Sequence, residues 1–258
     1  MKPDYLNAIV HMNELENQTS FNIIPPSNDL KHIVELFWSI KWNLPDGKVF
    51  NQQIIPNPHI NIVHYGDSTF VEGVVKKLFE YHLQSSGEIL GIKFKIGAFN
   101  NLTKVKMSTF TNQKIQIGEI LEPTQWENLK DLNSTEEKVV YMENLLLNYA
   151  HPVDNKGLFV EKVINYIREN KSITSVDMVA KNFNKNIRSI QRDFDTYVGV
   201  NPKWIIRMFR LQELNKELEM DSTPHWADLA AKLGYADQPH MINDFKSILG
   251  ITPREYKE

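Results

Sequence analysis

The stretch DFKSILGITPREY, residues 244–256, repeats an outline that occurs earlier in the chain as DFDTYVGVNPKWI, residues 193–205. Both copies contain an Asp-Phe pair, a glycine, then Asn or Thr, and a proline followed by a basic residue. Glycine suits the left-handed residue that ends a helix, Asn or Thr caps the next helix, and proline fits the first helical turn. Each copy therefore predicts the end of one helix, a tight turn and the start of another helix.

A second matched segment, with apolar residues at the same spacing, precedes each copy. Its matched residues are Val179, Ala180 and Phe183 in the first copy and Leu229, Ala230 and Leu233 in the second. These residues face the apolar positions of the following helix across a short turn, and the alanines allow the two helices to cross closely. Each repeat therefore predicts a helix-turn-helix, whose second helix can enter a DNA major groove. Residues 203–220, which connect the repeats, predict one long helix of about 27 Å.

The order of these elements resembles the DNA-binding part of the AraC/XylS transcription regulators, in which one long helix joins two helix-turn-helix units. The resemblance covers residues 157–258 and is most specific in the stretch LAAKLGYADQPHMINDFKSILGITPREY, residues 229–256. It implies a sequence-specific transcription regulator that binds double-stranded DNA. RNA polymerase and a second copy of the chain, in a homodimer, are the further partners that we expect.

The first recognition helix offers Arg188, Gln191 and Arg192, which project together because they are three to four residues apart. Arginine suits guanine edges and phosphates, and glutamine suits adenine. The matching residues of the second helix are Gln238, Pro239, Ile242 and Asn243. Both sets stand at positions that resemble the DNA-contacting positions of the family.

The second helix departs from the family pattern, because Asn243 stands where the family usually has a basic residue. Asp193 and Asp244 lie beside the two faces and would weaken the attraction to phosphates. An alternative interpretation makes Arg188 and Arg192 an ordinary solvated surface that is paired with Asp195.

Charge alone does not indicate a nucleic-acid partner. The 258-residue chain has a formal net charge of −3, and residues 157–258 contain 15 of its 29 Lys and Arg and 14 of its 32 Asp and Glu. Phosphate contacts must therefore come from locally clustered cations, and binding should be sensitive to salt. The near-neutral balance favours an alternative in which the helical half is a protein-interaction module.

Residues 20–120 are typical of a β-rich region. Runs such as FNQQIIP, HINIVHY, LFEYHLQ and EILGIKFKIGAF are separated by turn signals and predict strands, while SNDLKHIVELFWSI, residues 27–40, predicts a covering helix. A capping box from Ser134 to Glu137 predicts a further helix. The expected fold is an α+β sensor domain, with a small antiparallel sheet or barrel plus helices, followed by an all-α double helix-turn-helix domain. We expect a sensor, effector or dimerisation domain over residues 1–130, a linker helix and linker over 131–156, and the DNA-binding domain over 157–258.

The N-terminal part resembles a partly β sensor domain found in one subgroup of these regulators. The resemblance implies that it binds a small-molecule effector, mediates dimerisation, or both. The candidate effector-pocket residues are Trp38, Trp42, His59, His64, Tyr65, Glu72 and Phe94.

The alternative from another functional class is a metal-dependent β-barrel enzyme that uses His59, His64, Glu72 and His82. On one straight strand His59 and His64, five residues apart, point to opposite faces and cannot share a metal. The chain has no cysteine, and it shows no nucleophile elbow, phosphate-binding glycine loop or adjacent His-carboxylate metal motif. We therefore expect no catalysis, no metal and no cofactor. The first residues lack the apolar core of a signal peptide, and no stretch reaches roughly 18 apolar residues, so we expect a cytoplasmic protein without a membrane partner.

Overall fold

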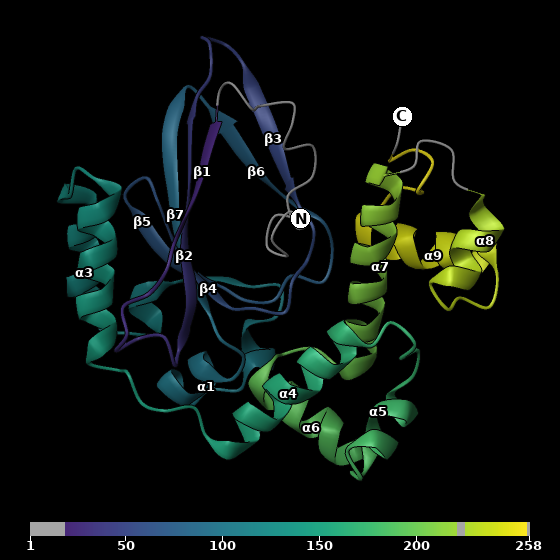
Figure 1. Ribbon diagram of the computed structural model, residues 1–258. Helices are drawn as coiled ribbons and strands as arrows, with labels where there is room; N and C mark the ends of the chain where they lie inside the picture. Colours follow the sequence, from purple (N-terminus) through teal and green to yellow (C-terminus); the bar gives the residue numbers. More distant parts are fainter. Residues whose placement is uncertain (1–18, 221–224, 257–258) are drawn as a thin grey trace.

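The computed structural model describes residues 19–220 and 225–256 (Figure 1). The strands are β1 Thr19–Ile24, β2 Val34–Asn43, β3 Val49–Ile54, β4 Asn61–Tyr65, β5 Ser68–Glu72, β6 Phe79–Gln84, β7 Ser86–Phe94 and β8 Lys114–Gln116. The helices are α1 Ala98–Thr103, α2 Pro123–Trp126, α3 Thr135–Leu147, α4 Asn155–Glu169, α5 Val176–Asn182, α6 Ile187–Tyr197, α7 Pro202–Met220, α8 Trp226–Lys232 and α9 Gln238–Leu249. The fold class predicted from the sequence is confirmed. The expectation that the first residues lack a signal peptide concerns residues 1–18, which lie outside the described part.

The β-rich part consists of a six-stranded antiparallel sheet in the order β1-β2-β7-β4-β5-β8 and a two-stranded sheet formed by β3 and β6. The inner face of the large sheet and the β3/β6 pair enclose one hydrophobic cluster, which includes Trp42, Phe70 and Leu83. The outer face carries buried residues such as Phe37 and Ile92, which belong to a second, larger cluster. Both faces of the central strands are therefore buried.

The helix predicted within residues 27–40 is wrong, because residues 34–43 form strand β2. β2 pairs with β1 on one side and β7 on the other. Both of its faces are largely covered, and the strand register shifts between Val34 and Leu36. Apolar residues therefore follow one another without strict alternation, and their spacing imitates that of a helix. The capping box of α3, by contrast, is confirmed, with Ser134 and Glu137 in reciprocal hydrogen bonds.

The helical half consists of two helix-turn-helix units at the two ends of α7. Figure 1 shows α4, α5 and α6 at one end of this long helix and α8 and α9 at the other. The continuous helix predicted between the repeats is confirmed, because α7 runs unbroken from Pro202 to Met220. No helix in the described ranges, 19–220 and 225–256, is long and apolar enough to cross a membrane.

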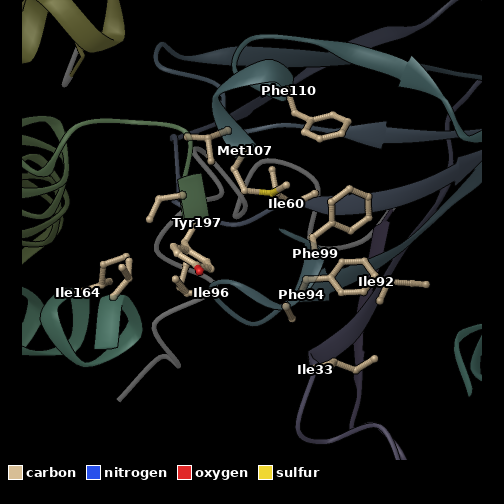
Figure 2. Close-up of a cluster of buried hydrophobic side chains, with 14 of the residues drawn as sticks. Ile33, Ile60, Ile92, Phe94, Ile96, Phe99, Met107, Phe110, Ile164 and Tyr197 are labelled. Atoms are coloured by element: carbon tan, nitrogen blue, oxygen red, sulfur yellow. The ribbon is translucent and has the colours of Figure 1, made fainter. Parts of the chain in front are cut away.

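The first unit shares its core with the β-rich part. Figure 2 shows Ile164 and Tyr197, from α4 and α6, gathered with Ile96 and Phe99 in one buried cluster. The Thr111 hydroxyl donates to the Gly199 carbonyl at 2.6 Å. The two parts of the chain therefore pack as one body at this end of α7.

The second unit has a separate hydrophobic cluster around Met241 and Phe245. It reaches the β-rich part through Ile55, which belongs to the same cluster, and through the Leu78 amide, which donates to the Ile248 carbonyl at 2.8 Å. These contacts hold the C-terminal end of α9 against the segment that precedes β6.

Candidate nucleic-acid interface and internal cavity

The turns of the two units have one backbone geometry. Asn184 and Gly234 both adopt a positive φ, 48° and 70°. The backbone amide of the next residue makes the same hydrogen bond in both units. The Lys185 amide donates to the Ala180 carbonyl at 3.0 Å, and the Tyr235 amide donates to the Ala230 carbonyl at 2.9 Å. The repeat seen in the sequence is therefore a repeat of structure.

Each recognition helix begins at a side-chain cap. The Asn186 side chain accepts from the Arg188 amide at 2.8 Å, and the Asp237 side chain accepts from the His240 amide at 2.7 Å. At the other end, Gly199 and Gly250 have φ angles of 91° and 82°. The prediction that glycine ends each helix in the left-handed region is confirmed.

The apolar stripe of each recognition helix is buried, as its spacing predicted. Phe194 and Phe245, at matching positions, are 0% and 1% exposed. Packing of these rings against α5 and α8 fixes which face of α6 and α9 is turned outward.

The outward face of α6 presents the three predicted DNA-contacting side chains, and Arg188, Gln191 and Arg192 are all exposed. Arg192 makes only long contacts, 3.5 Å to the Ser189 hydroxyl and 3.9 Å to the Asp193 carboxylate. Asp195, the partner in the alternative interpretation, instead lies 3.5 Å from the Lys106 ammonium. Both arginine side chains of this face are therefore exposed, and the ion pair with Asp195 that the alternative interpretation requires is not among the contacts of the described residues.

The four predicted residues of α9 lie at its N-terminal half, where Pro239 and Asn243 are exposed and Gln238 and Ile242 are half-buried. Sequence reasoning missed Lys246, an exposed cation one helical turn beyond Ile242. Its position on the same face was the signal that could have found it.

Asp244 does not leave an uncompensated charge beside this face. Its carboxylate accepts from Arg207 of α7 at 2.8 Å, and the same guanidinium donates to the Ser247 hydroxyl at 2.6 Å. The arginine lies 37 residues away in the sequence, so only the folded chain shows that it neutralises Asp244.

A cavity of about 550 Å³ lies between the inner face of the sheet and the helices α4 and α7. Of the predicted pocket residues, Trp38, His59 and Glu72 line it. The others lie elsewhere: Trp42 and Phe94 are buried in hydrophobic clusters, Tyr65 packs beside Trp42, and the His64 ring bonds the Thr69 hydroxyl at 2.9 Å.

Three charged or titratable groups that line the cavity form a compact network that sequence reasoning did not predict. Glu35 lies 2.9 Å from the Lys93 ammonium and 3.2 Å from His59 Nδ1. Burial lowers the pKa of His59 to about 4, so the ring is neutral at pH 7 and donates from Nδ1 to the Phe94 carbonyl at 3.0 Å. Arg168 of α4 lines the same space from the opposite side.

The side chains of the metal-enzyme alternative do not converge. His59 bonds the Phe94 carbonyl, whereas His64 bonds Thr69 and His82 lies 2.6 Å from Asn51. Within residues 19–220 and 225–256, no three His, Asp or Glu side chains are grouped to hold a metal ion.

Two family models match separate parts of the chain. Residues 22–116 match a domain of unknown function, DUF6597, and residues 179–258 match a helix-turn-helix domain. The second match spans most of α5 and everything that follows it.

Curated relatives match mainly through partial alignments. The F1 operon positive regulatory protein of Yersinia pestis is 30% identical over 104 residues, which are 40% of this chain and 34% of that protein. The HTH-type transcriptional activator RhaS of Escherichia coli O139:H28 is 22% identical over 145 residues, 54% of this chain and 52% of that protein. The chain thus spans between a third and about half of the length of these relatives.

Solved structures similar to the chain include the C-terminal domain of the response regulator AraT from Geobacillus stearothermophilus. It has 20% identity and a TM-score of 0.37, over 40% of this chain and 87% of that one. ToxT from Vibrio cholerae has 12% identity and a TM-score of 0.39, over 93% and 98%. The family matches, together with both helix-turn-helix units and the helix that joins them, show that the chain carries an AraC-type helix-turn-helix domain in its C-terminal part and a DUF6597 domain in its N-terminal part.

Proposed function

We propose that the protein is a sequence-specific DNA-binding transcription regulator in which α6 and α9 enter successive turns of the major groove. The observation that supports this most directly is the pair of helix-turn-helix units at the ends of α7, a helix of 19 residues. Such a helix is about 28 Å long. Successive major grooves on one DNA face are roughly 34 Å apart, so the widths of the recognition helices make up the difference.

The two helix-turn-helix units would contact DNA unequally. Arg188, Gln191 and Arg192 of α6 offer two cations and an amide, which suit guanine, phosphate and adenine. Gln238, Pro239, Ile242 and Asn243 of α9 offer two amides, with Lys246 farther along the same face. We therefore propose that the first unit reads sequence strongly and that the second contributes a weaker half, with some preference for adenine.

Selection of bound sequences from a randomised DNA library, with the full-length chain, tests this proposal. The expected result is an asymmetric motif, most of whose information lies in the half that directed cleavage assigns to α6. Equal or greater information in the α9 half would contradict our reading of Asn243 and its neighbours.

Salt dependence separates this proposal from the protein-interaction alternative. Because phosphate contacts release counterions, affinity for the selected site should fall steeply as salt rises. Affinity that stays flat with salt, and shows no sequence preference, would support an interaction module instead.

The division of labour proposed for the chain follows the sequence boundaries. Residues 1–130 would sense, residues 131–156 would connect, and residues 157–258 would bind DNA. The cavity between the sheet and α4 and α7 would hold a small effector. A bound effector would contact both parts at once and so favour one of two arrangements of the DNA-binding helices.

The remaining partners are also proposals. RNA polymerase is proposed because one matched relative is named as a transcriptional activator and another as a positive regulator. A second copy of the chain is proposed as a homodimer partner, and the cytoplasm as the location, since the DNA partner lies there. We propose no enzymatic role, because the matched relatives are named as regulators.

A further inference from the structure

The cavity has a floor that is built across four strands. The indole of Trp38, in β2, fills the space above Gly91 of β7, where a Cβ would lie 2.2 Å from Trp38 Cε2. Its Nε1 donates to the Asn61 side chain at 3.2 Å. Asn61 in β4 is paired with Glu72 in β5. The absence of a side chain at Gly91 thus allows a tryptophan, an amide and a carboxyl group to lie in one row.

Aromatic surface surrounds the carboxyl end of this row. Phe21, Trp38, Phe79 and Tyr81 line the cavity, and all four are only half-buried. The Tyr81 hydroxyl donates to Glu72 Oε2 at 2.6 Å. This part of the cavity lining therefore combines ring faces with one carboxyl group.

The charges that line the cavity are unevenly compensated. Glu35 is paired with Lys93 at 2.9 Å, and Glu213 is paired with Lys216 at 3.1 Å and with Lys171, which lies outside the lining, at 2.5 Å. The lining also includes Glu161 and Glu169 together with Lys95 and Arg168. Among the lining residues that the structure describes, five carboxyl groups, Glu72 included, stand against four Lys and Arg.

The cation paired with Glu72 across the sheet contacts an aromatic ring. Lys114, its neighbour across β5 and β8, places its ammonium 3.4 Å from the centre of the Phe70 ring. Burial raises the pKa of Glu72, although the Tyr81 hydroxyl and Lys114 act in the opposite direction. A cation that entered from the cavity would compensate this carboxylate and would meet the aromatic faces that attract ammonium groups.

We propose that the cavity binds a small organic ammonium ion with an apolar or aromatic body, its charged nitrogen beside Glu72 and its body against Trp38 and Tyr81. This inference rests on the proposed role of the cavity as the effector site. The opposite wall is formed by Ile164 and Arg168 of α4 and by Phe209 and Gln212 of α7. A ligand of this class therefore touches both helices that carry the DNA-binding units.

Calorimetric titration of the full-length protein with three probes of similar shape tests the ligand class. The probes are phenethylamine, which is cationic, phenylethanol, which is neutral, and hydrocinnamate, which is anionic. We expect phenethylamine to bind at least about tenfold more tightly than phenylethanol, with hydrocinnamate weakest, because only the amine pairs with Glu72.

Two matched variants locate the charge that is responsible. Glu72→Gln keeps an acceptor for the Tyr81 hydroxyl and removes the negative charge, so phenethylamine affinity should fall about tenfold, to the level of phenylethanol. Glu161→Gln removes the same charge from α4, on the opposite wall, and should leave the preference unchanged. Circular dichroism reports whether each variant folds. If Glu72→Gln does not fold, the three probes on the unmodified protein still decide the charge preference.

Hydrocinnamate binding as tight as that of phenethylamine would overturn the inference and point to Lys95 and Arg168 as an anion site. An unchanged amine preference in folded Glu72→Gln would overturn it as well. Fluorescence anisotropy with the selected DNA site distinguishes the two proposals. Normal DNA binding without amine binding refutes only the ligand class, whereas amine binding without any DNA affinity refutes only the proposed function.

Discussion

Alanine at Gly199 should destabilise the protein more than alanine at Gly250, although the two glycines occupy matching positions with φ angles of 91° and 82°. The left-handed backbone costs an alanine about 1–2 kcal/mol at either site. A Cβ at Gly250 would have no neighbour within 4 Å, whereas one at Gly199 would lie 2.6 Å from the Met107 carbonyl oxygen and 2.7 Å from the Thr111 hydroxyl. Relieving that overlap at Gly199 should cost a further ~1–3 kcal/mol of the free energy of unfolding.

Urea unfolding of both variants, followed by circular dichroism, measures the difference in the free energy of unfolding. Gly250→Ala serves as the internal control, because it carries the same backbone strain without the clash. If both variants lose equal stability, the close packing of the first unit against residues 107–111 does not exist in solution, and the shared core that we describe is wrong.

Three further outcomes are expected. Arg192→Ala should weaken binding to the selected DNA site by about 1–3 kcal/mol in anisotropy titrations, with unchanged helical content and melting temperature, because the side chain lies outside the apolar stripe. Phe194→Ala or Phe245→Ala should lower the free energy of unfolding by about 3–5 kcal/mol in urea titrations, since both rings are buried, and a variant that unfolds like the parent would show an exposed ring. Burial raises the pKa of Asp154, but hydrogen bonds from the α4 backbone and the Tyr197 hydroxyl lower this pKa overall. The ionised Asp154 therefore stabilises the fold above the unfolded pKa of about 3.9, and this stabilisation is lost as pH falls through the folded pKa. Asp154→Asn should flatten the loss of stability as pH falls below about 3.9, and an unchanged acid profile would contradict this.

The helical half could be predicted because its signals are local. Gly199, Gly250 and the caps of the recognition helices act on the backbone within a few residues, so a repeat of residue types produces a repeat of turns. The buried positions of α6 and α9 followed from the helical spacing of their apolar residues. What the local pattern could not supply was the partner of Asp244, because Arg207 approaches it from another helix.

Strand β2 escaped prediction for a different reason. A strand that is covered on both faces has no polar side to reveal its period, and the apolar residues from Ile33 to Ile40 fit a helical spacing equally well. Only the pairing with β1 and β7 decides between the two structures, and that pairing joins residues far apart in the sequence.

The cavity was predictable only in part. Trp38, His59 and Glu72 could be named as polar or aromatic residues in a β-rich region, but the network of Glu35 with Lys93 depends on the register between β2 and β7. Residues of α4 and α7, which follow the whole β-rich part in the sequence, enter the same space. Such convergence is a property of the tertiary fold and leaves no motif in the sequence.

The two units are held to the β-rich part in different ways, and this difference bears on how a ligand could act. The first unit shares a continuous core with the sheet, so moving it would disrupt buried packing. The second unit is held mainly by Ile55, by the Leu78 to Ile248 hydrogen bond, and by Gln212 of α7, which donates to the Pro56 carbonyl at 3.2 Å. Segments with few buried contacts open at lower free-energy cost. Because Gln212 also lines the cavity, a ligand of the proposed class would act on the weaker attachment and would change the spacing between α6 and α9.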